Sequence, residues 1–203
     1  MQKKGSIYPG LVFLFLLVTG GQTLSQDHYA DSIGSYRKKY VKNHEVVKGD
    51  DKKDMHFFPV DKAYRIPARF KKVSQSPWFN MPTSSGALKE YRVYGILHFT
   101  LHDTALQLNV YQSRSLMNIR EYADHLFIPF TDKTSGEESY ENGRYIDLDM
   151  ADLASVNYVL DFNAAYNPYC AYISGRYSCP IPPKENDLPV AIRAGEMKFG
   201  KVH

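Results

Sequence analysis

The two cysteines of the chain, Cys170 and Cys179, are the first candidates for chemistry. They lie in the segment DFNAAYNPYCAYISGRYSCPIPPKEN with eight residues between them. A structural metal site needs four ligands, and neither a CxxC pair nor a close histidine supplies them. A nucleophilic cysteine needs a histidine base, and none occurs in the sequence between His125 and His203. We therefore expect a disulfide in an oxidising compartment, which for so short a loop contributes about 2.5–3 kcal/mol; a free thiol, a metal ligand and a nucleophile are the alternatives.

Carboxylates form the second candidate group. Asp147 lies in RYIDLDM and Asp161 in VNYVLDFN, and the five-residue link ADLAS between these segments predicts a hairpin. Such a hairpin sets Tyr145 opposite Asp161, with Asp147 nearby. Carboxylates this close raise one another's pKa, or else recruit Arg144 or a divalent cation. The candidate acid or base residues are therefore Glu138, Asp147 and Asp161, and the alternative is a solvated polar face.

Amides and aromatic rings surround the cysteines and form a candidate ligand site. Rings cover the apolar faces of a sugar or small polar molecule, while amides bond its hydroxyls. The predicted ligand-binding residues are Arg144, Tyr145, Asn163, Tyr166 and Asn167. In the alternative interpretation the amides cap turns and the tyrosines pack inward.

Other motifs are weak. Ser135 in TSG lacks the glycine two residues earlier that a hydrolase elbow requires. His98 and His102 share one strand face, a pattern that suits a metal but is more typical of solvent-facing side chains. The sequence contains no glycine-rich phosphate loop, HExxH or CxxCH. We therefore predict neither a cofactor nor a metal.

Periodicity indicates the elements that position these residues. Tyr29, Ile33, Tyr36 and Tyr40 recur at helical spacing, which predicts an amphipathic helix over residues 27–42. Alternating apolar residues then predict strands in YRIPARF, YRVYGILHFTL, LQLNVY, HLFIPF, RYIDLDM, VNYVLDF and LPVAIR. The second and third of these are expected to form a hairpin around Asp103. The fold class is therefore mostly β, an antiparallel sandwich or partly closed barrel with an N-terminal amphipathic helix.

The start of the chain has the pattern of a secretory signal peptide over residues 1–25. Lys3 and Lys4 precede the short apolar run GLVFLFLLVTG, and cleavage after Ser25 would leave residues 26–203 as a single globular domain. Loss of the two lysines lowers the formal net charge from +3 to +1. This balance gives no basic surface for nucleic acid. We expect an extracytoplasmic protein, periplasmic or secreted, without a stable membrane span after signal removal.

Several stretches together carry a family resemblance. They are YRIPARF, MPTSSG, YGILHFTL, FIPFTDKTSGEESYENGRYIDLD, LDFNAAYNPYCAY and YSCPIPPKENDLPVAIRAGE. Their order and composition resemble the family catalogued as domain of unknown function 1684, over roughly residues 30–198. The resemblance implies one compact domain found in bacterial proteins, and it transfers no reaction. One departure is His102-Asp103, where a hairpin glycine is expected.

The function these observations favour is binding of a small polar or carbohydrate-like ligand by an exported protein. One alternative is a hydrolase that uses a carboxylate as acid or base, with or without a divalent metal. Another is a structural partner in an envelope assembly, with exposed edge strands as its interface.

Overall fold

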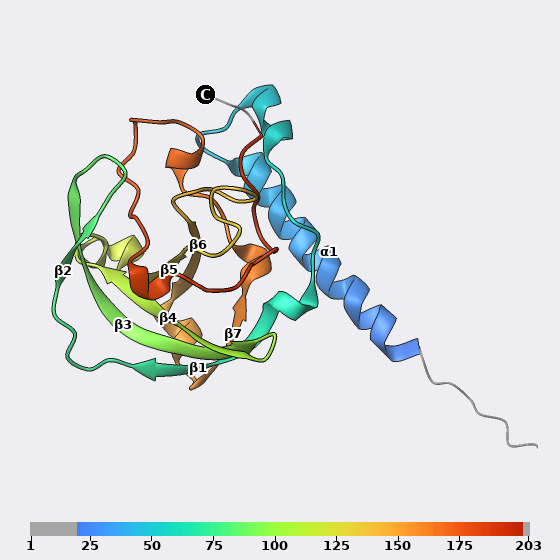
Figure 1. Cartoon of the computed structure of the whole chain (residues 1–203), viewed down its shortest axis with the longest axis horizontal. Coiled ribbons are helices and arrows are strands. Elements are labelled where there is room, and N and C mark those ends of the chain that lie inside the picture. The colour runs from blue at the N-terminus through green and yellow to red at the C-terminus, as the bar shows by residue number, and fades with distance from the viewer. Residues whose placement is uncertain (1–19, 201–203) are drawn as a thin grey trace, which may run out of the picture.

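A curled antiparallel sheet dominates this computed structural model, which describes the backbone of residues 20–200 and the side chains from residue 28 onward (Figure 1). Its strands are β1 (Arg65–Lys72), β2 (Phe79–Pro82), β3 (Leu88–Leu101), β4 (Thr104–Ser113), β5 (His125–Phe130), β6 (Arg144–Asp149) and β7 (Asn157–Asp161). They are ordered β6-β5-β4-β3-β1-β7, and β2 pairs with β3. The sheet forms a half-barrel, which confirms the predicted mostly-β antiparallel class.

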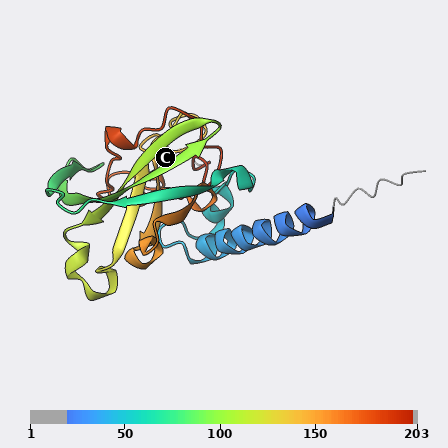
Figure 2. The ribbon, with the colours of Figure 1, turned by 90° about the horizontal axis from the view of Figure 1, so that it is seen from below.

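One long helix, α1 (Gly20–Asn43), lies along the side of the sheet, and its first turns project beyond it (Figures 1 and 2). The predicted helix is therefore confirmed, although it begins before Asp27. Three of its tyrosines hydrogen-bond to later parts of the chain: Tyr29 to Asp161, Tyr36 to the carbonyl of Ala164, and Tyr40 to Glu196. Of the predicted signal peptide, residues 1–19 lie outside the described residues. No helix in the described part of the chain is long and apolar enough to cross a membrane.

The connections contain short 3-10 helices. These are η1 (Gly49–Asp54), η2 (Lys62–Tyr64), η3 (Leu116–Asn118), η4 (Arg120–Tyr122), η5 (Met150–Leu153), η6 (Phe162–Ala164), η7 (Tyr169–Ala171) and η8 (Lys184–Asn186). Each is one or two turns long, so the sheet and α1 supply the framework.

Apolar side chains pack on both faces of the sheet. The larger cluster includes Leu97, Leu108, Ile128 and Leu160, each fully buried. A smaller aromatic cluster lies on the other face and consists of Met81, Tyr91, Tyr111, Phe127 and Tyr145. A sheet with apolar groups on both faces must be covered on both, and the second face carries the site described below.

A β-bulge explains how β3 serves both clusters. The register against β4 shifts between Val93 and Gly95, so the strand gains one residue there. A one-residue shift reverses which face each side chain occupies. Tyr91 therefore belongs to the aromatic cluster, whereas Leu97 belongs to the larger one. A side chain at Gly95 would meet the ring of Phe70 at 2.2 Å, which explains the glycine.

The predicted hairpin between β3 and β4 is confirmed. Its turn consists of His102 and Asp103, whose φ angles of 47° and 60° place both in the left-handed region. A two-residue hairpin turn of type I′ requires this conformation at both central positions, and aspartate tolerates it better than most residues. The turn therefore forms without the expected glycine.

Two sequence predictions about the sheet are wrong. Strands β6 and β7 do not pair: β6 pairs with β5 and β7 with β1, at opposite ends of the strand order. The segment LPVAIR is not a strand but an irregular stretch. Its carbonyl at Ile192 accepts from the guanidinium of Arg144, so a side chain takes the place of a neighbouring strand.

Candidate functional site

A cleft of about 750 Å³ lies between α1, the outer face of β6 and the segment around Cys179. We call it the tyrosine cleft because six of its lining residues are tyrosines: Tyr36, Tyr40, Tyr145, Tyr166, Tyr169 and Tyr177. Charged groups also line it, namely Lys39, Glu45, Lys89 and Asp147. A volume of this size and an aromatic lining with a few polar groups are typical of small-molecule sites.

Alternation along β6 directs two of the predicted residues into the cleft. Ile146 and Leu148 belong to the larger apolar cluster, so Tyr145 and Asp147 lie on the opposite face. The backbone of Tyr145 then pairs with that of Tyr166 through N–H···O bonds of 2.9 and 3.0 Å. This short pairing holds the Tyr166 ring 5.9 Å from the Tyr145 ring.

Asp147 is the best-positioned acidic group of the cleft. One carboxylate oxygen accepts from the Tyr166 hydroxyl at 2.7 Å, and the other lies 3.2 Å from Nε2 of His125. Its side chain is nevertheless 47% exposed. The hydrogen bond to Asp147 raises the pKa of His125 against the opposing effect of burial. Tyr166 and His125 therefore fix the orientation of the Asp147 carboxylate, while part of it stays accessible to a ligand.

The cysteine pair holds one wall of the cleft. Cys170 and Cys179 lie at disulfide distance, with their Cα atoms 6.2 Å apart. Residues 177–180 of this stapled loop, which we define as residues 170–180, line the cleft. The turn after β2 fixes the loop from outside, because Ser84 accepts from the backbone N–H of Cys179 at 3.1 Å and donates to the carbonyl of Tyr177 at 3.2 Å.

His44, just after α1, presents an unused hydrogen-bonding group. Its Nδ1 accepts from the backbone N–H of Val47 at 2.9 Å, whereas its buried Nε2 has no partner among the described residues. Burial lowers the pKa of His44 to about 4. The ring is therefore neutral at pH 7, with its proton on Nε2. His44 also belongs to the lining of the cleft.

A buried carboxylate, Glu196, anchors the helix beside the cleft. It is 1% exposed and accepts from the hydroxyls of Tyr172 at 2.6 Å and Tyr40 at 3.2 Å, and from the backbone N–H of Asn167 at 2.9 Å. Burial raises the pKa of Glu196 to about 7, although these donors act against the rise. The group therefore titrates near neutral pH in the folded protein.

This titration makes stability depend on pH. Because the folded pKa of about 7 exceeds the ordinary value of 4.5, the folded state keeps a proton that the unfolded chain releases. The stabilisation is complete below pH 4.5 and is lost as pH rises through 7. We expect the unfolding free energy of wild type minus that of Glu196→Gln to fall across this window in denaturant titrations. Glu185→Gln, at an exposed position, should run parallel to wild type; a parallel Glu196→Gln profile would contradict the assignment.

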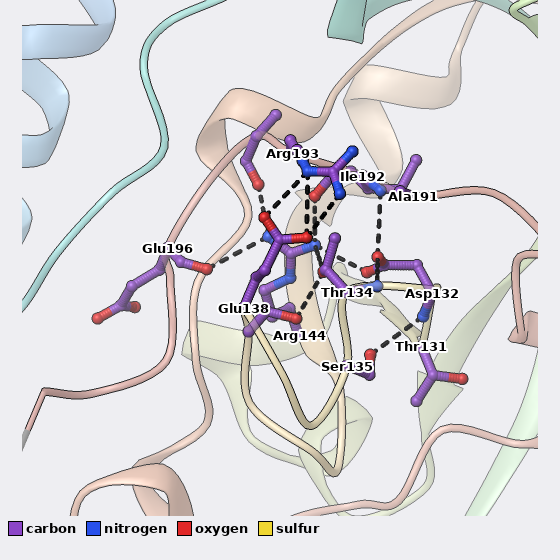
Figure 3. Close-up of polar contacts among 12 residues, drawn as sticks. Thr131, Asp132, Thr134, Ser135, Glu138, Arg144, Ala191, Ile192, Arg193 and Glu196 are labelled. Carbon is purple, nitrogen blue, oxygen red and sulfur yellow. Dashed lines mark hydrogen bonds and ion pairs between the residues drawn. The ribbon is translucent and has the colours of Figure 1, made fainter.

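Arg144, a predicted ligand-binding residue, lies in the protein interior. It is fully buried, and its guanidinium donates to Asp132 Oδ2 at 2.7 Å and to the carbonyls of Ile192, Ala194 and Glu196 (Figure 3). Asp132 in turn accepts from the backbone N–H groups of Ile192 and Thr134. The pair joins the segment after β5 to the C-terminal segment and does not line the cleft.

The two predicted asparagines are also internal. The side chain of Asn163 bonds the backbone of Asp61 in both directions, at 3.0 and 2.8 Å, and also donates to the hydroxyl of Tyr29. Asn167 is fully buried and donates to the carbonyl of Met197. Both act as internal bridges between distant segments in this structure.

Glu138 and Asp161 lie outside the cleft as well. Glu138 pairs with Arg193 at 2.8 Å on the surface. Asp161 accepts from Tyr29 of α1 at 2.7 Å. Of the predicted site residues, the structure thus brings together Tyr145, Asp147 and Tyr166 beside the stapled loop, and places the others elsewhere.

Sequence reasoning missed most of the helix side of the cleft. The spacing of Tyr36 and Tyr40 predicts one helical face. Such a face indicates only that the helix packs against the domain, and it does not reveal that these residues border a cavity. Their spacing of four residues, together with Lys39, was the available signal. Lys89 and His44 gave none, because only the fold places them beside β6.

Comparisons with known proteins identify the family and a similar structure. The family model described as "Protein of unknown function (DUF1684)" matches residues 51–197. The solution NMR structure of an uncharacterized protein of Haloarcula marismortui is 28% identical with a TM-score of 0.62, and the match covers 87% of this chain and 97% of that chain. The curated proteins gave no match. None of these descriptions states an activity.

Proposed function

We propose, from the premise that this chain belongs to the family described as protein of unknown function DUF1684, that it binds a small polar organic molecule in the tyrosine cleft. The observation that carries this proposal is the cleft itself, which is lined by six tyrosines and by the half-exposed carboxylate of Asp147. Rings and a carboxylate next to solvent provide apolar contact together with a directed polar contact.

The Nε2 of His44, which has no hydrogen-bond partner in the part of the chain that the structure describes, supports the same proposal. A buried donor without a partner costs free energy comparable to a lost hydrogen bond. His44 lies in the lining of the cleft, so an acceptor on a bound molecule would remove this cost. The two polar groups, Asp147 and His44, come from different elements, and a ligand that bonds both would bridge β6 and the end of α1.

The proposal includes export. The N-terminal pattern of Lys3, Lys4 and a short apolar run favours a signal peptide, and the cysteine pair at disulfide distance suits an oxidising compartment. The intact mass of the protein purified from its own host tests both together. A chain that begins at Gln26 and lacks two thiol hydrogens supports export, whereas a chain that retains Met1 and two thiols contradicts it.

Ligand binding is tested on the mature chain by ligand-observed NMR against sugars, amino acids, nucleosides and alkylammonium compounds. We expect binding that Asp147→Asn weakens about tenfold or more, because a hydrogen bond to a charged group is lost. Asp31→Asn is the matched control, since Asp31 is exposed on α1 and outside the cleft.

Two results would contradict this function. The first is a complete lack of binding across the compounds. The second is binding that Asp147→Asn and Tyr166→Ala both leave unchanged. Turnover of the ligand that Asp147→Asn abolishes while affinity is retained would instead assign Asp147 as a catalytic acid or base.

A further inference from the structure

We propose that the tyrosine cleft selects an organic cation, a quaternary ammonium or alkylated amine, with Asp147 as its counter-ion. This inference rests on the proposed function and adds the chemical class of the ligand. Aromatic rings around a cation, completed by a carboxylate, are the arrangement that recognises such groups in water. The evidence lies in the position of the negative charge, the arrangement of the rings and the state of the neighbouring cations.

The negative charge of Asp147 acts on tyrosines of α1, of β6 and of the segment after β7. Burial is the largest cause of the raised pKa of Tyr36, Tyr145 and Tyr166, and the charge of Asp147 raises each of them further. Asp147 likewise adds to the raised pKa of Tyr169. These phenols are therefore neutral at pH 7. A positive group in the cleft would be attracted by the carboxylate and by the π faces of the tyrosine rings.

The rings are set at angles to one another. The Tyr166 ring lies 6.0 Å from the Tyr40 ring at 50° and 5.9 Å from the Tyr145 ring at 85°. A flat ligand needs parallel faces, whereas a rounded trialkylammonium group contacts several inclined faces at once. The negative face of each ring then adds to the attraction of Asp147.

Four basic residues of the described part of the chain lie in the lining or beside Asp147, and they differ in how far they compete with a bound cation. His125 competes from outside the lining, because its Nε2 lies 3.2 Å from Asp147 and this contact raises its pKa. Lys89 donates from Nζ to the carbonyl of Ser178 at 2.7 Å and is thus held at the stapled-loop wall. His44 is uncharged at pH 7 because burial lowers its pKa to about 4. Lys39 is a cation of the lining on α1, and a second carboxylate, Glu45, lies on the same side of the cleft.

Acetylcholine and its uncharged carbon isostere 3,3-dimethylbutyl acetate provide the test, because they have nearly the same shape. Calorimetric titration of the mature chain should give an affinity about tenfold or more higher for the cation. Asp147→Asn should remove this preference, whereas Asp31→Asn should keep it. Equal affinities for the two compounds, or a preference that survives Asp147→Asn, would overturn the inference.

Tyr36 supplies a second variant, because it is 42% exposed and its hydroxyl makes only one long hydrogen bond, 3.4 Å to the carbonyl of Ala164. Tyr36→Leu should weaken the cation more than the isostere, and Tyr36→Phe should restore the difference, since the ring and not the hydroxyl acts. Equal weakening of both compounds by Tyr36→Leu argues against the inference.

The outcome for other compounds separates this inference from the proposed function. Binding of another compound at Asp147 without any preference for acetylcholine refutes the cation alone. Absence of binding by every compound refutes both.

Discussion

Replacing Asp132 with asparagine is expected to lower the free energy of unfolding by about 3–5 kcal/mol, because the fully buried guanidinium of Arg144 then lacks its counter-ion. The substitution keeps the volume and most of the hydrogen-bonding geometry, so the effect reports the charge. The same change should loosen the C-terminal segment, whose carbonyls at Ile192 and Ala194 are bonded by Arg144.

Denaturant titration of the two proteins at pH 7 measures this effect. Glu138→Gln is the matched control, since it breaks a second ion pair between the same two segments, Glu138 with Arg193, at the exposed surface. Exposed pairs contribute little, so this variant should stay close to wild type. An Asp132→Asn protein that is as stable as Glu138→Gln would show that the buried pair is not needed for the fold.

The second large effect is expected from the cysteines. Replacing both Cys170 and Cys179 with serine should lower the unfolding free energy by about 2.5–3 kcal/mol, since the unfolded chain regains the freedom of a loop closed over eight residues. For a chain of this length that corresponds to roughly 5–12 °C in melting temperature. Because Tyr177 and Pro180 line the cleft, ligand affinity should fall as well.

A reductant distinguishes the contribution of the disulfide to stability from other effects of the two serine substitutions. The melting temperature of wild type should fall to that of the double-serine variant when dithiothreitol is added. The melting temperature of the variant should not change. Melting temperatures of wild type that are identical with and without reductant, at full reduction of the thiols, would refute the stabilising role.

The sequence predicted the class of fold from alternation and helical spacing because these patterns depend only on local geometry. Apart from the β3–β4 hairpin, it did not show which strands are neighbours. The link ADLAS is short enough for a hairpin, yet β6 pairs with β5 and β7 with β1, so the two strands form the opposite ends of the curled sheet. Nor could it show that the bulge before Gly95 reverses the faces of β3, because one inserted residue leaves no trace in composition.

The candidate site was predictable to a similar degree. Tyr145, Asp147 and Tyr166 fall in the cleft because strand alternation and the proximity of the stapled loop are local properties. The amides of Asn163 and Asn167 looked equally suited to a ligand. Their partners, Asp61 and Met197, are distant in the chain, so their burial follows only from the tertiary fold.

The docking of α1 separates the residues that hold the helix from those that line the cleft. The helix is held by hydroxyls, Tyr29 on Asp161 of β7 and Tyr40 on Glu196 of the C-terminal segment, and it lies before residue 51, where the family model begins. It also provides Tyr36 and Lys39 to the cleft. Substitutions at Tyr36 or Lys39 would therefore change the lining of the cleft while both of these hydrogen bonds stay in place.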